Sequence, residues 1–261
     1  MTNRNHLLAN AVILCLLATN GGVASASEAP PASTELDAIA KKAELQLHQS
    51  FANLQFEDFG PAPVKGPIFQ ASAGGRILYY APQSDHLLFA TIYDRSGVNL
   101  TALAQDASAR RKLGQLDPAQ ALSIGPPGAP TVIEFTDPDC PYCRALDRFW
   151  AAKAAEGKHV RRQIYFVSGI HPQAASKAEH ILCSKDQAGA FRATYAGDAP
   201  KPLVTCKEGV ARVVANAQAV KAMGISGTPT LILDGRVISG FQQAEIEAWL
   251  DEKQAPKKPP S

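Results

Sequence analysis

The most regular hydrophobic pattern lies in the middle of the chain. Residues 132–136 read Val-Ile-Glu-Phe-Thr, a β-branched and apolar run that is typical of a strand. After a turn that contains Pro138, a helical pattern opens at Cys143 and continues through Leu146 and Phe149. The pattern therefore predicts a strand, a tight turn and a helix in direct succession.

Strand and helix patterns also alternate after this helix. Residues 159–167 form an apolar run that predicts a second strand, and residues 173–223 carry a long helical pattern. We expect this helical stretch to break near residues 197–202 and again at Gly209, because glycine and proline interrupt helices.

A hairpin and a helix are predicted at the C-terminal end. Residues 230–233 and 236–239 flank Asp234-Gly235, a dipeptide typical of a two-residue hairpin turn. A closing helix over residues 242–253 follows, with Ile246, Trp249 and Leu250 on its inner face. The predicted order of the C-terminal half is therefore β-α-β, a helical insert and β-β-α.

The N-terminal third has a different pattern of apolar residues, with more frequent proline and glycine after its first helix. Thr34 and Asp37 match a capping box, and the apolar residues after it predict one amphipathic helix. These apolar residues are Leu36, Ile39, Ala40, Ala43, Leu47 and Phe51. From residue 56 to residue 94, short apolar runs alternate with proline and glycine. Residues 76–81 and 86–93 are expected to form neighbouring antiparallel strands.

A third helix is predicted over residues 101–114, with Leu103, Ala107 and Leu113 on one side. It lies between the N-terminal region and the alternating strands and helices of the C-terminal half, which indicates an interdomain linker. The small domain before it holds no cysteine and no cluster of titratable groups, so we expect a structural or associative role for it. A domain of that size buries little core by itself, which favours pairing with a second copy.

The start of the chain reads as a signal peptide. Arg4 supplies a basic region, residues 7–18 an apolar region too short to span a bilayer, and Ala24-Ser25-Ala26 a cleavage site. The bulky Leu14 before Cys15 argues against a lipid anchor. The 261 residues, 46% of them hydrophobic and 19% charged, suffice for two modest domains.

Cleavage after Ala26 changes the cysteine count and the charge. It removes Cys15 and Arg4, so the mature chain keeps four of the five cysteines and a formal charge one unit below +2. A near-neutral chain gives no electrostatic case for nucleic acid or an anionic membrane as a partner. Export also places the protein in an oxidising compartment, where disulfides are available as substrates.

The candidate chemistry is the segment Cys140-Pro141-Tyr142-Cys143. The strand-turn-helix pattern puts Cys140 at a helix N-terminus, where backbone N–H groups and the helix dipole stabilise a thiolate. Cys143 follows one turn later, within reach of a mixed disulfide formed at Cys140. The pattern is typical of dithiol chemistry.

A lone CxxC motif is also half of a zinc site. Such a site needs two more cysteine or histidine ligands at matched spacing. Cys183 and Cys206 lie far apart and form no second CxxC motif, and no histidine forms a clear ligand pair with a cysteine. We therefore expect no metal and no cofactor.

The motifs carry a family resemblance that covers nearly the whole mature chain. The order of elements, with CxxC after the first strand and the segment 227–230 (Gly-Thr-Pro-Thr) before the hairpin, resembles the thioredoxin fold. Further matching segments are residues 59–66, Tyr93-Asp94 with the linker helix, residues 135–137, residues 224–229 and residues 240–242. With these segments, the chain resembles the DsbC/DsbG family of periplasmic disulfide isomerases.

The resemblance implies a fold class and a domain layout. It implies an α/β thioredoxin-like catalytic domain with a helical insert, preceded by a small α+β, cystatin-like dimerisation domain and a linker helix. We expect the following boundaries: signal peptide 1–26, dimerisation domain 27–98, linker 99–122, catalytic domain 123–254 and disordered tail 255–261.

The resemblance also implies partners and site residues. It implies a periplasmic homodimer whose apolar cleft receives unfolded or misoxidised exported proteins, and a membrane reductase of the DsbD type as electron donor. Thr228-Pro229 is expected to be a cis bond beside the CxxC motif, with Tyr142 and Thr228 shaping the approach of the substrate. Cys183 and Cys206 fall where DsbC-like members carry a structural disulfide; two independent buried thiols are the alternative.

Two positions depart from the DsbC pattern. The dipeptide between the cysteines is Pro-Tyr, as in DsbG-like proteins, whereas DsbC resembles a Gly-Tyr form. Glu134 stands where thioredoxin and the DsbA oxidases place a buried acid and DsbC-like members an apolar residue. Burial would raise the pKa of the Glu134 carboxyl and let it shuttle the proton of Cys143; a strand glutamate that faces solvent is the alternative.

The predicted function is isomerisation or reduction of wrong disulfides in exported proteins by Cys140 and Cys143. Three alternative functions are compatible with the same residues. A DsbG-like protein would reduce sulfenic acids on single cysteines. An oxidase would hold the pair oxidised, but the extra N-terminal domain argues against it. A chaperone would bind unfolded clients, with redox chemistry secondary.

Overall fold

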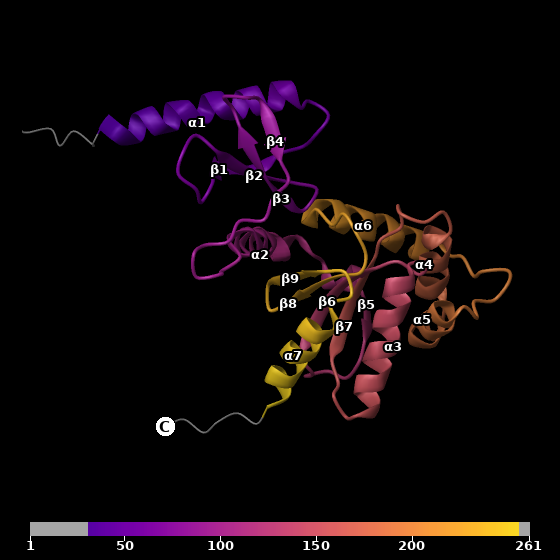
Figure 1. The fold of residues 1–261 in the computed structure, drawn as a ribbon. Helices are drawn as coiled ribbons and strands as arrows, with labels where there is room; N and C mark the ends of the chain where they lie inside the picture. Colours follow the sequence, from indigo (N-terminus) through magenta and orange to yellow (C-terminus); the bar gives the residue numbers. More distant parts are fainter. Residues whose placement is uncertain (1–30, 256–261) are drawn as a thin grey trace, which may run out of the picture. The chain divides into compact units, whose positions relative to one another are not determined.

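The computed structural model describes residues 31–255, with side chains from residue 36 onward (Figure 1). The predicted signal peptide with its cleavage site, and the predicted tail apart from Ala255, lie outside the described residues.

The N-terminal elements are one helix and a four-stranded antiparallel sheet (Figure 1). They are α1 (Pro31–Ser50), β1 (Glu57–Pro61), β2 (Phe69–Ala73), β3 (Arg76–Ala81) and β4 (His86–Leu88), and the sheet order is β1-β2-β3-β4. Helix α1 lays Ala43 and Leu47 against the buried residues Phe69, Ala71, Leu78 and Tyr80 of the sheet.

The sequence predicted helix α1 and strands β3 and β4, but some of their bounds and buried residues differ in the structure. Helix α1 begins at Pro31, a favoured first residue, and not at the predicted capping box. Leu36 and Ile39 were predicted to face inward but are exposed, because the core cluster under the helix begins only near Ala40. Strand β4 stops at Leu88, where its pairing with β3 ends, and does not reach Tyr93. Strands β1 and β2 were not predicted.

Helix α2 (Leu100–Lys112) is the predicted linker helix, but the residues that it buries differ from the predicted ones. Leu103 is 51% exposed, and the buried residues are Asp106, Ser108 and Ala109. Asp106 Oδ1 accepts a hydrogen bond of 2.8 Å from the backbone N–H of Val237. Because a sheet edge offers backbone donors, the buried side of this helix carries a carboxylate, which the apolar periodicity could not show. The short 3₁₀ turns Leu113–Gln115 and Pro118–Gln120 follow.

The C-terminal sheet has five strands in the order β5-β7-β6-β8-β9. They are β5 (Leu122–Ile124), β6 (Thr131–Thr136), β7 (Arg161–Phe166), β8 (Thr230–Leu233) and β9 (Arg236–Ser239). Strands β6 and β7 are parallel, and the other pairs are antiparallel. The predicted hairpin at Asp234-Gly235 is confirmed, whereas the three residues of β5 were too few to show a pattern.

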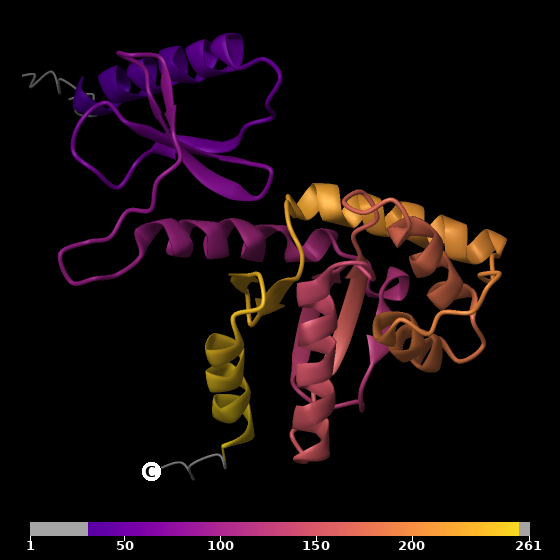
Figure 2. The same cartoon turned by 45° about the vertical axis from the view of Figure 1, so that its right-hand side comes forward.

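Helices cover both faces of this sheet (Figure 2). They are α3 (Pro141–Ala155), α4 (Ala174–Cys183), α5 (Gln187–Ala196), α6 (Lys207–Met223) and α7 (Gln243–Gln254). Leu146 and Trp150 of α3 join Trp249 and Leu250 of α7 in a cluster on one face. Met223 of α6 packs with residues of the opposite face, such as Phe135 and Tyr165. The predicted thioredoxin-like order, β-α-β, helical insert and β-β-α, is confirmed with β5 added before it.

Of the two breaks predicted in the helical insert, the one near residues 197–202 is confirmed and the one at Gly209 is wrong. Breaks lie at residues 184–186 and 197–206, and Gly209 lies inside the first turn of α6. A Cβ atom on residue 209 would lie 2.3 Å from Cys183 Sγ. Glycine is therefore required at this position for space beside a neighbouring chain segment, and not for ending a helix.

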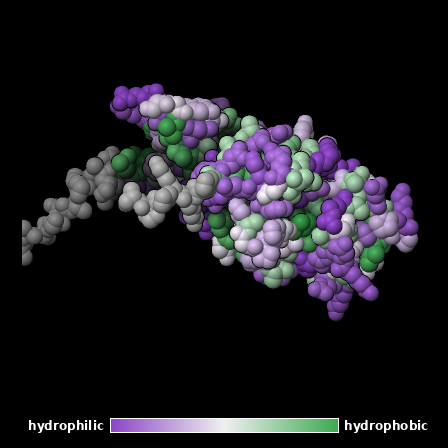
Figure 3. All heavy atoms as spheres, turned by 90° about the horizontal axis from the view of Figure 1, so that it is seen from below, coloured by the Kyte–Doolittle hydropathy of each residue, from purple (hydrophilic) through white to green (hydrophobic). Residues whose placement is uncertain are grey.

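The surface mixes polar and apolar residues. Figure 3 shows mainly hydrophilic side chains on one face, with hydrophobic ones scattered between them. Between residues 31 and 255, no helix has both the length and the apolar character that crossing a membrane requires.

Candidate active site

The CxxC motif lies where β6 runs into α3. The chain leaves β6 at Thr136 and turns through Asp137, whose backbone oxygen accepts the N–H of Cys140 at 3.1 Å. Cys140 is the N-cap of α3, and Pro141 is the first helical residue. The helix therefore begins two residues before the predicted start at Cys143, because proline is well suited to the first helical position. Cys140 lies at a helix N-terminus, as the sequence predicted.

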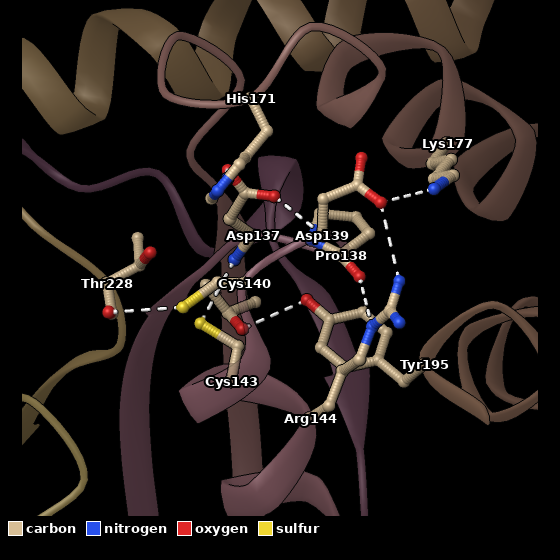
Figure 4. A network of polar contacts seen from close by, with 11 residues as sticks. Asp137, Pro138, Asp139, Cys140, Cys143, Arg144, His171, Lys177, Tyr195 and Thr228 are labelled. Atoms are coloured by element: carbon tan, nitrogen blue, oxygen red, sulfur yellow. Dashed lines mark hydrogen bonds and ion pairs between the residues drawn. The ribbon is translucent and has the colours of Figure 1, made fainter. Parts of the chain in front are cut away.

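The two sulfurs have different surroundings (Figure 4). Both cysteines are free; Cys140 is 5% exposed and Cys143 is fully buried. The thiol of Cys140 donates to the backbone oxygen of Thr228 at 3.4 Å. Cys143 Sγ accepts the backbone N–H of Asp137 at 3.4 Å. Cys140 is therefore the sulfur nearer to solvent and to the loop at residue 228.

Burial controls the acidity of the inner thiol. Burial raises the pKa of Cys143 to about 12. Hydrogen bonds with Thr136 and Asp137 lower the pKa, but burial has the larger effect. At neutral pH the thiol of Cys143 is therefore protonated. Cys140 is therefore the candidate nucleophile, and Cys143, which is protonated, is the candidate resolving cysteine.

This difference predicts the order of alkylation. Iodoacetamide reacts with thiolates, so the reduced protein at pH 7 is expected to take up one label, at Cys140. Because burial raises the pKa of Cys143 to about 12, Cys143 should stay almost unlabelled up to pH 10. Peptide mass spectrometry after labelling from pH 6 to pH 10 measures both sites. Denatured protein, in which both thiols react, is the control; preferential labelling of Cys143 in the folded protein would contradict the assignment.

The loop before β8 faces the outer sulfur. Thr228-Pro229 is a cis peptide bond, as predicted from the family resemblance. The Pro229 carbonyl accepts the N–H of Gly240 at 2.8 Å, and Thr230 Oγ1 donates to the Gly227 carbonyl at 2.8 Å. Tyr142, in the first turn of α3, is 65% exposed. The structure thus places Thr228 against Cys140 and leaves the Tyr142 ring open to solvent.

Glu134 is fully buried, but its partner is an arginine. Arg162 donates two hydrogen bonds of 2.9 Å to the Glu134 carboxylate and one of 2.6 Å to Asp147. Burial disfavours a charged guanidinium, yet the carboxylates of Glu134 and Asp147 outweigh it and raise the pKa of Arg162. In the described part of the chain, no hydrogen bond joins Glu134 to either cysteine. The expected shuttling of a proton to Glu134 therefore has no supporting contact.

Arg162 is one residue that the sequence reasoning missed. It stands in β7 on the same face as Ile164 and Phe166, with its side chain buried. A charged residue inside an otherwise apolar alternation is the signal that could have identified it as the partner of a buried acid.

Cys183 and Cys206 form a disulfide with their Cα atoms 5.7 Å apart. The bond joins the end of α4 to the N-cap of α6, and Cys206 Sγ accepts the N–H of Gly209 at 3.2 Å. The two cysteines are 23 positions apart in the sequence. Closing a loop of this size stabilises the chain by about 3.4 kcal/mol in the chain-entropy model.

A second missed feature lies beside the inner cysteine. His171 Nδ1 is 2.8 Å from Asp137 Oδ2, and Asp137 Oδ1 accepts the N–H of Asp139 at 2.8 Å. Asp139 in turn pairs with Lys177 and with Arg144 (Figure 4). His171 follows β7 in an irregular loop, where the sequence pattern carries no signal. For residues 31–255, the structure shows no group of three acidic, histidine or cysteine side chains arranged to hold a metal.

Comparison with known proteins finds relatives over both parts of the chain. Residues 24–102 match the family model "Disulfide bond isomerase protein N-terminal domain", and residues 118–254 match the model "Thioredoxin-like domain". The chain is 26% identical over 230 residues to a thiol:disulfide interchange protein DsbG from Pseudomonas aeruginosa, covering 84% of this chain and 85% of that protein.

Two further matches cover about half of the chain. The DsbG of Escherichia coli is 30% identical over 136 residues, which are 49% of this chain and 54% of that protein. A solved disulfide interchange protein from Neisseria gonorrhoeae is 28% identical, with a TM-score of 0.42, over 53% of this chain and 99% of its own.

Proposed function

Since the chain belongs to the thioredoxin-like proteins and, among them, to the DsbC/DsbG family of thiol:disulfide interchange proteins, we propose that it isomerises or reduces wrong disulfides in exported proteins. It is a thiol:disulfide oxidoreductase. The observation that carries the proposal is the free pair at the start of α3, with Cys140 at the N-cap and 5% exposed and Cys143 fully buried one turn later.

The proposed reaction begins at Cys140. Its thiolate sulfur attacks one sulfur of a client disulfide, and the other client sulfur leaves as a thiolate. The resulting mixed disulfide then has two fates. In isomerisation, a client thiolate attacks the client sulfur bonded to Cys140, so that a new client disulfide forms and Cys140 leaves as a thiolate. Alternatively, Cys143 attacks Cys140, and the client leaves reduced while the enzyme is oxidised.

Tyr142, Thr228 and Pro229 are the proposed substrate-binding residues. The contact between the Thr228 carbonyl and the thiol of Cys140 supports this, because a peptide held along the loop at residue 228 would meet the reacting sulfur. The exposed Tyr142 ring offers apolar area beside it. The disulfide between Cys183 and Cys206 is proposed to be structural, because it joins two helices of the insert.

The remaining proposals concern assembly and location. The match of residues 24–102 to the isomerase N-terminal domain supports a homodimer and the division into a dimerisation domain (27–98), a linker (99–122) and a catalytic domain (123–254). We also propose export to the periplasm after cleavage near Ala26 and a DsbD-type reductase as electron donor; the family membership supports both. For Glu134, the ion pair with Arg162 supports a structural role in place of a catalytic one.

A second candidate function is reduction of sulfenic acids on single cysteines. The matches to DsbG proteins and the shared Pro-Tyr dipeptide favour it. In that reaction the Cys140 thiolate attacks the sulfenic sulfur and the S–O bond breaks; the leaving hydroxide takes a proton from solvent to become water, and a mixed disulfide remains.

Two substrates separate these functions. The mature, reduced protein is incubated in a mildly reducing buffer with a scrambled protein of several disulfides, and in parallel with a protein that carries one cysteine sulfenic acid. Isomerisation predicts catalysed recovery of the native activity of the first substrate. Recovery of the first substrate no faster than in buffer alone, with rapid reduction of the second, would contradict isomerisation and favour the sulfenic acid function.

A further inference from the structure

The hydroxyl group of Thr136 accepts a hydrogen bond from a buried tyrosine. Thr136 is the last residue of β6, Tyr195 stands in α5, and both side chains are buried. The Tyr195 hydroxyl donates to Thr136 Oγ1 at 2.9 Å and points toward the CxxC motif (Figure 4). Burial holds the pKa of Tyr195 well above its usual value, so this hydroxyl stays protonated and remains a donor.

This contact leaves the proton of Thr136 available to a second partner. A hydroxyl carries one proton, so an oxygen that accepts from Tyr195 still has its own O–H to donate. Among the hydrogen bonds of the described residues, no oxygen accepts from Thr136 Oγ1. Burial raises the pKa of Cys143, and a hydrogen bond from the Thr136 side chain opposes this effect. The acceptor of the Thr136 proton is therefore Cys143 Sγ.

The inner sulfur thus has two donors. The backbone N–H of Asp137 donates to it at 3.4 Å, and the hydroxyl of Thr136 is the second donor. Cys143 is fully buried in a hydrophobic cluster that includes Ile164 and Phe166. Because no water solvates a thiolate in such surroundings, fixed donors stabilise it more than they would at the protein surface.

We propose that the Thr136 hydroxyl donates to the sulfur of Cys143 when that sulfur becomes a thiolate and resolves a mixed disulfide, and that Tyr195 holds the hydroxyl in its donating orientation. Thr136 touches the reacting sulfur, whereas Tyr195 acts through Thr136 and is a positioning residue. The Tyr195 ring is itself held by stacking on Phe191, with the ring centroids 4.0 Å apart. The inference rests on the proposed function and deepens it.

The step balances as follows. The S–H bond of Cys143 breaks, and its proton is released to solvent. The Cys143 thiolate attacks Cys140 Sγ, so that a bond forms between the two enzyme sulfurs and the bond from Cys140 to the client sulfur breaks. The client leaves as a thiolate and takes up a proton from solvent. The enzyme pair is oxidised, the client sulfur is reduced, and no proton is gained or lost overall.

The test separates the two chemical steps with one equivalent of 5,5′-dithiobis(2-nitrobenzoate). Cys140 of the reduced, full-length mature protein releases one coloured thionitrobenzoate as it forms the mixed disulfide, and Cys143 releases the second as it resolves it. Stopped-flow absorbance at pH 7 follows both phases. We expect Thr136→Val to leave the first phase unchanged and to slow the second about 3-fold to 10-fold. Fewer Cys143 thiols then ionise, although each thiolate is somewhat more nucleophilic.

Three further variants distinguish hydrogen bonding from a change in packing. Thr136→Ser keeps a hydroxyl and should restore most of the second-phase rate. Tyr195→Phe keeps the stacked ring and should slow the second phase about 2-fold to 5-fold, with no further effect in the Thr136→Val background, because it acts through that hydroxyl. Thr194→Val is the matched control: this buried hydroxyl of α5 has no hydrogen-bond partner among the described residues, so both phases should keep their wild-type rates.

Four results would contradict the inference. A second phase of Thr136→Val at the wild-type rate would overturn it, and so would Thr136→Ser as slow as Thr136→Val, or Thr194→Val as slow as either. Should Thr136→Val fail to fold, a wild-type second phase in Tyr195→Phe would still overturn the role of the pair. A wild type without a first phase would overturn the proposed function itself, and the inference with it.

Discussion

Replacing Cys140 with serine is expected to lower the rate of isomerisation of a scrambled substrate at least about 1,000-fold, because serine offers no nucleophile for a disulfide at neutral pH. Cys143→Ser should instead keep the first step. It retains the surface-side sulfur at the N-cap of α3 but cannot resolve the mixed disulfide. Covalent complexes with client proteins should therefore accumulate, visible as high-mass bands on gels run without reductant.

The controls for this prediction address folding and the chaperone alternative. Both serine variants should retain the circular dichroism spectrum of the wild type, because the change from sulfur to oxygen is small. In the double variant with serine at both positions, suppression of client aggregation at the wild-type level would favour a chaperone as the main function. Full isomerase activity in Cys140→Ser would refute the assignment of Cys140 as the nucleophile.

Replacing Arg162 with methionine is expected to lower the free energy of unfolding by about 3–5 kcal/mol, since it leaves the Glu134 carboxylate buried without its partner. Glu134 is fully buried and accepts two of the guanidinium hydrogen bonds, so no water can replace them without rearrangement of the core. Urea unfolding, read as a fall in the midpoint at constant slope, measures the loss.

Two further variants test this explanation. Glu134→Leu combined with Arg162→Met removes both charges, so most of the stability should return, and the double-mutant cycle should give a coupling of several kcal/mol. Lys253→Met breaks the more exposed pair with Asp234 and should cost less than about 1 kcal/mol. If Arg162→Met were no more destabilising than Lys253→Met, the ion pair would not be the stabilising element that the structure indicates.

Local features of the fold could be predicted from the sequence because their signals lie within a few residues. The hairpin of β8 and β9 follows from Asp234-Gly235, where both residues adopt positive φ angles. The strand-turn-helix unit follows from an apolar run, prolines and a helical period, and it places Cys140 at a helix N-terminus. The closing helix buries Ile246, Trp249 and Leu250 as its periodicity predicted.

The wrong predictions for helices α2 and α6 arise from contacts that apolar periodicity does not measure. The linker helix buries Asp106 because a backbone donor of β9 needs an acceptor, while the apolar Leu103 remains exposed. Gly209 indicated a break, yet it lies inside α6 because the sulfur of Cys183 occupies the space of a side chain. Periodicity measures apolar burial alone, so it cannot anticipate a helix that is held by a carboxylate or a glycine that gives room to a neighbour.

The reactive motif, the order of the elements and the family resemblance could be predicted without the structure, since these depend on residue types at short spacing. The tertiary structure decided what surrounds the motif. It paired Glu134 with Arg162 across 28 positions and Asp137 with His171 across 34. The physical reason is that a buried carboxylate takes its function from its hydrogen-bond partner, and folding alone selects that partner.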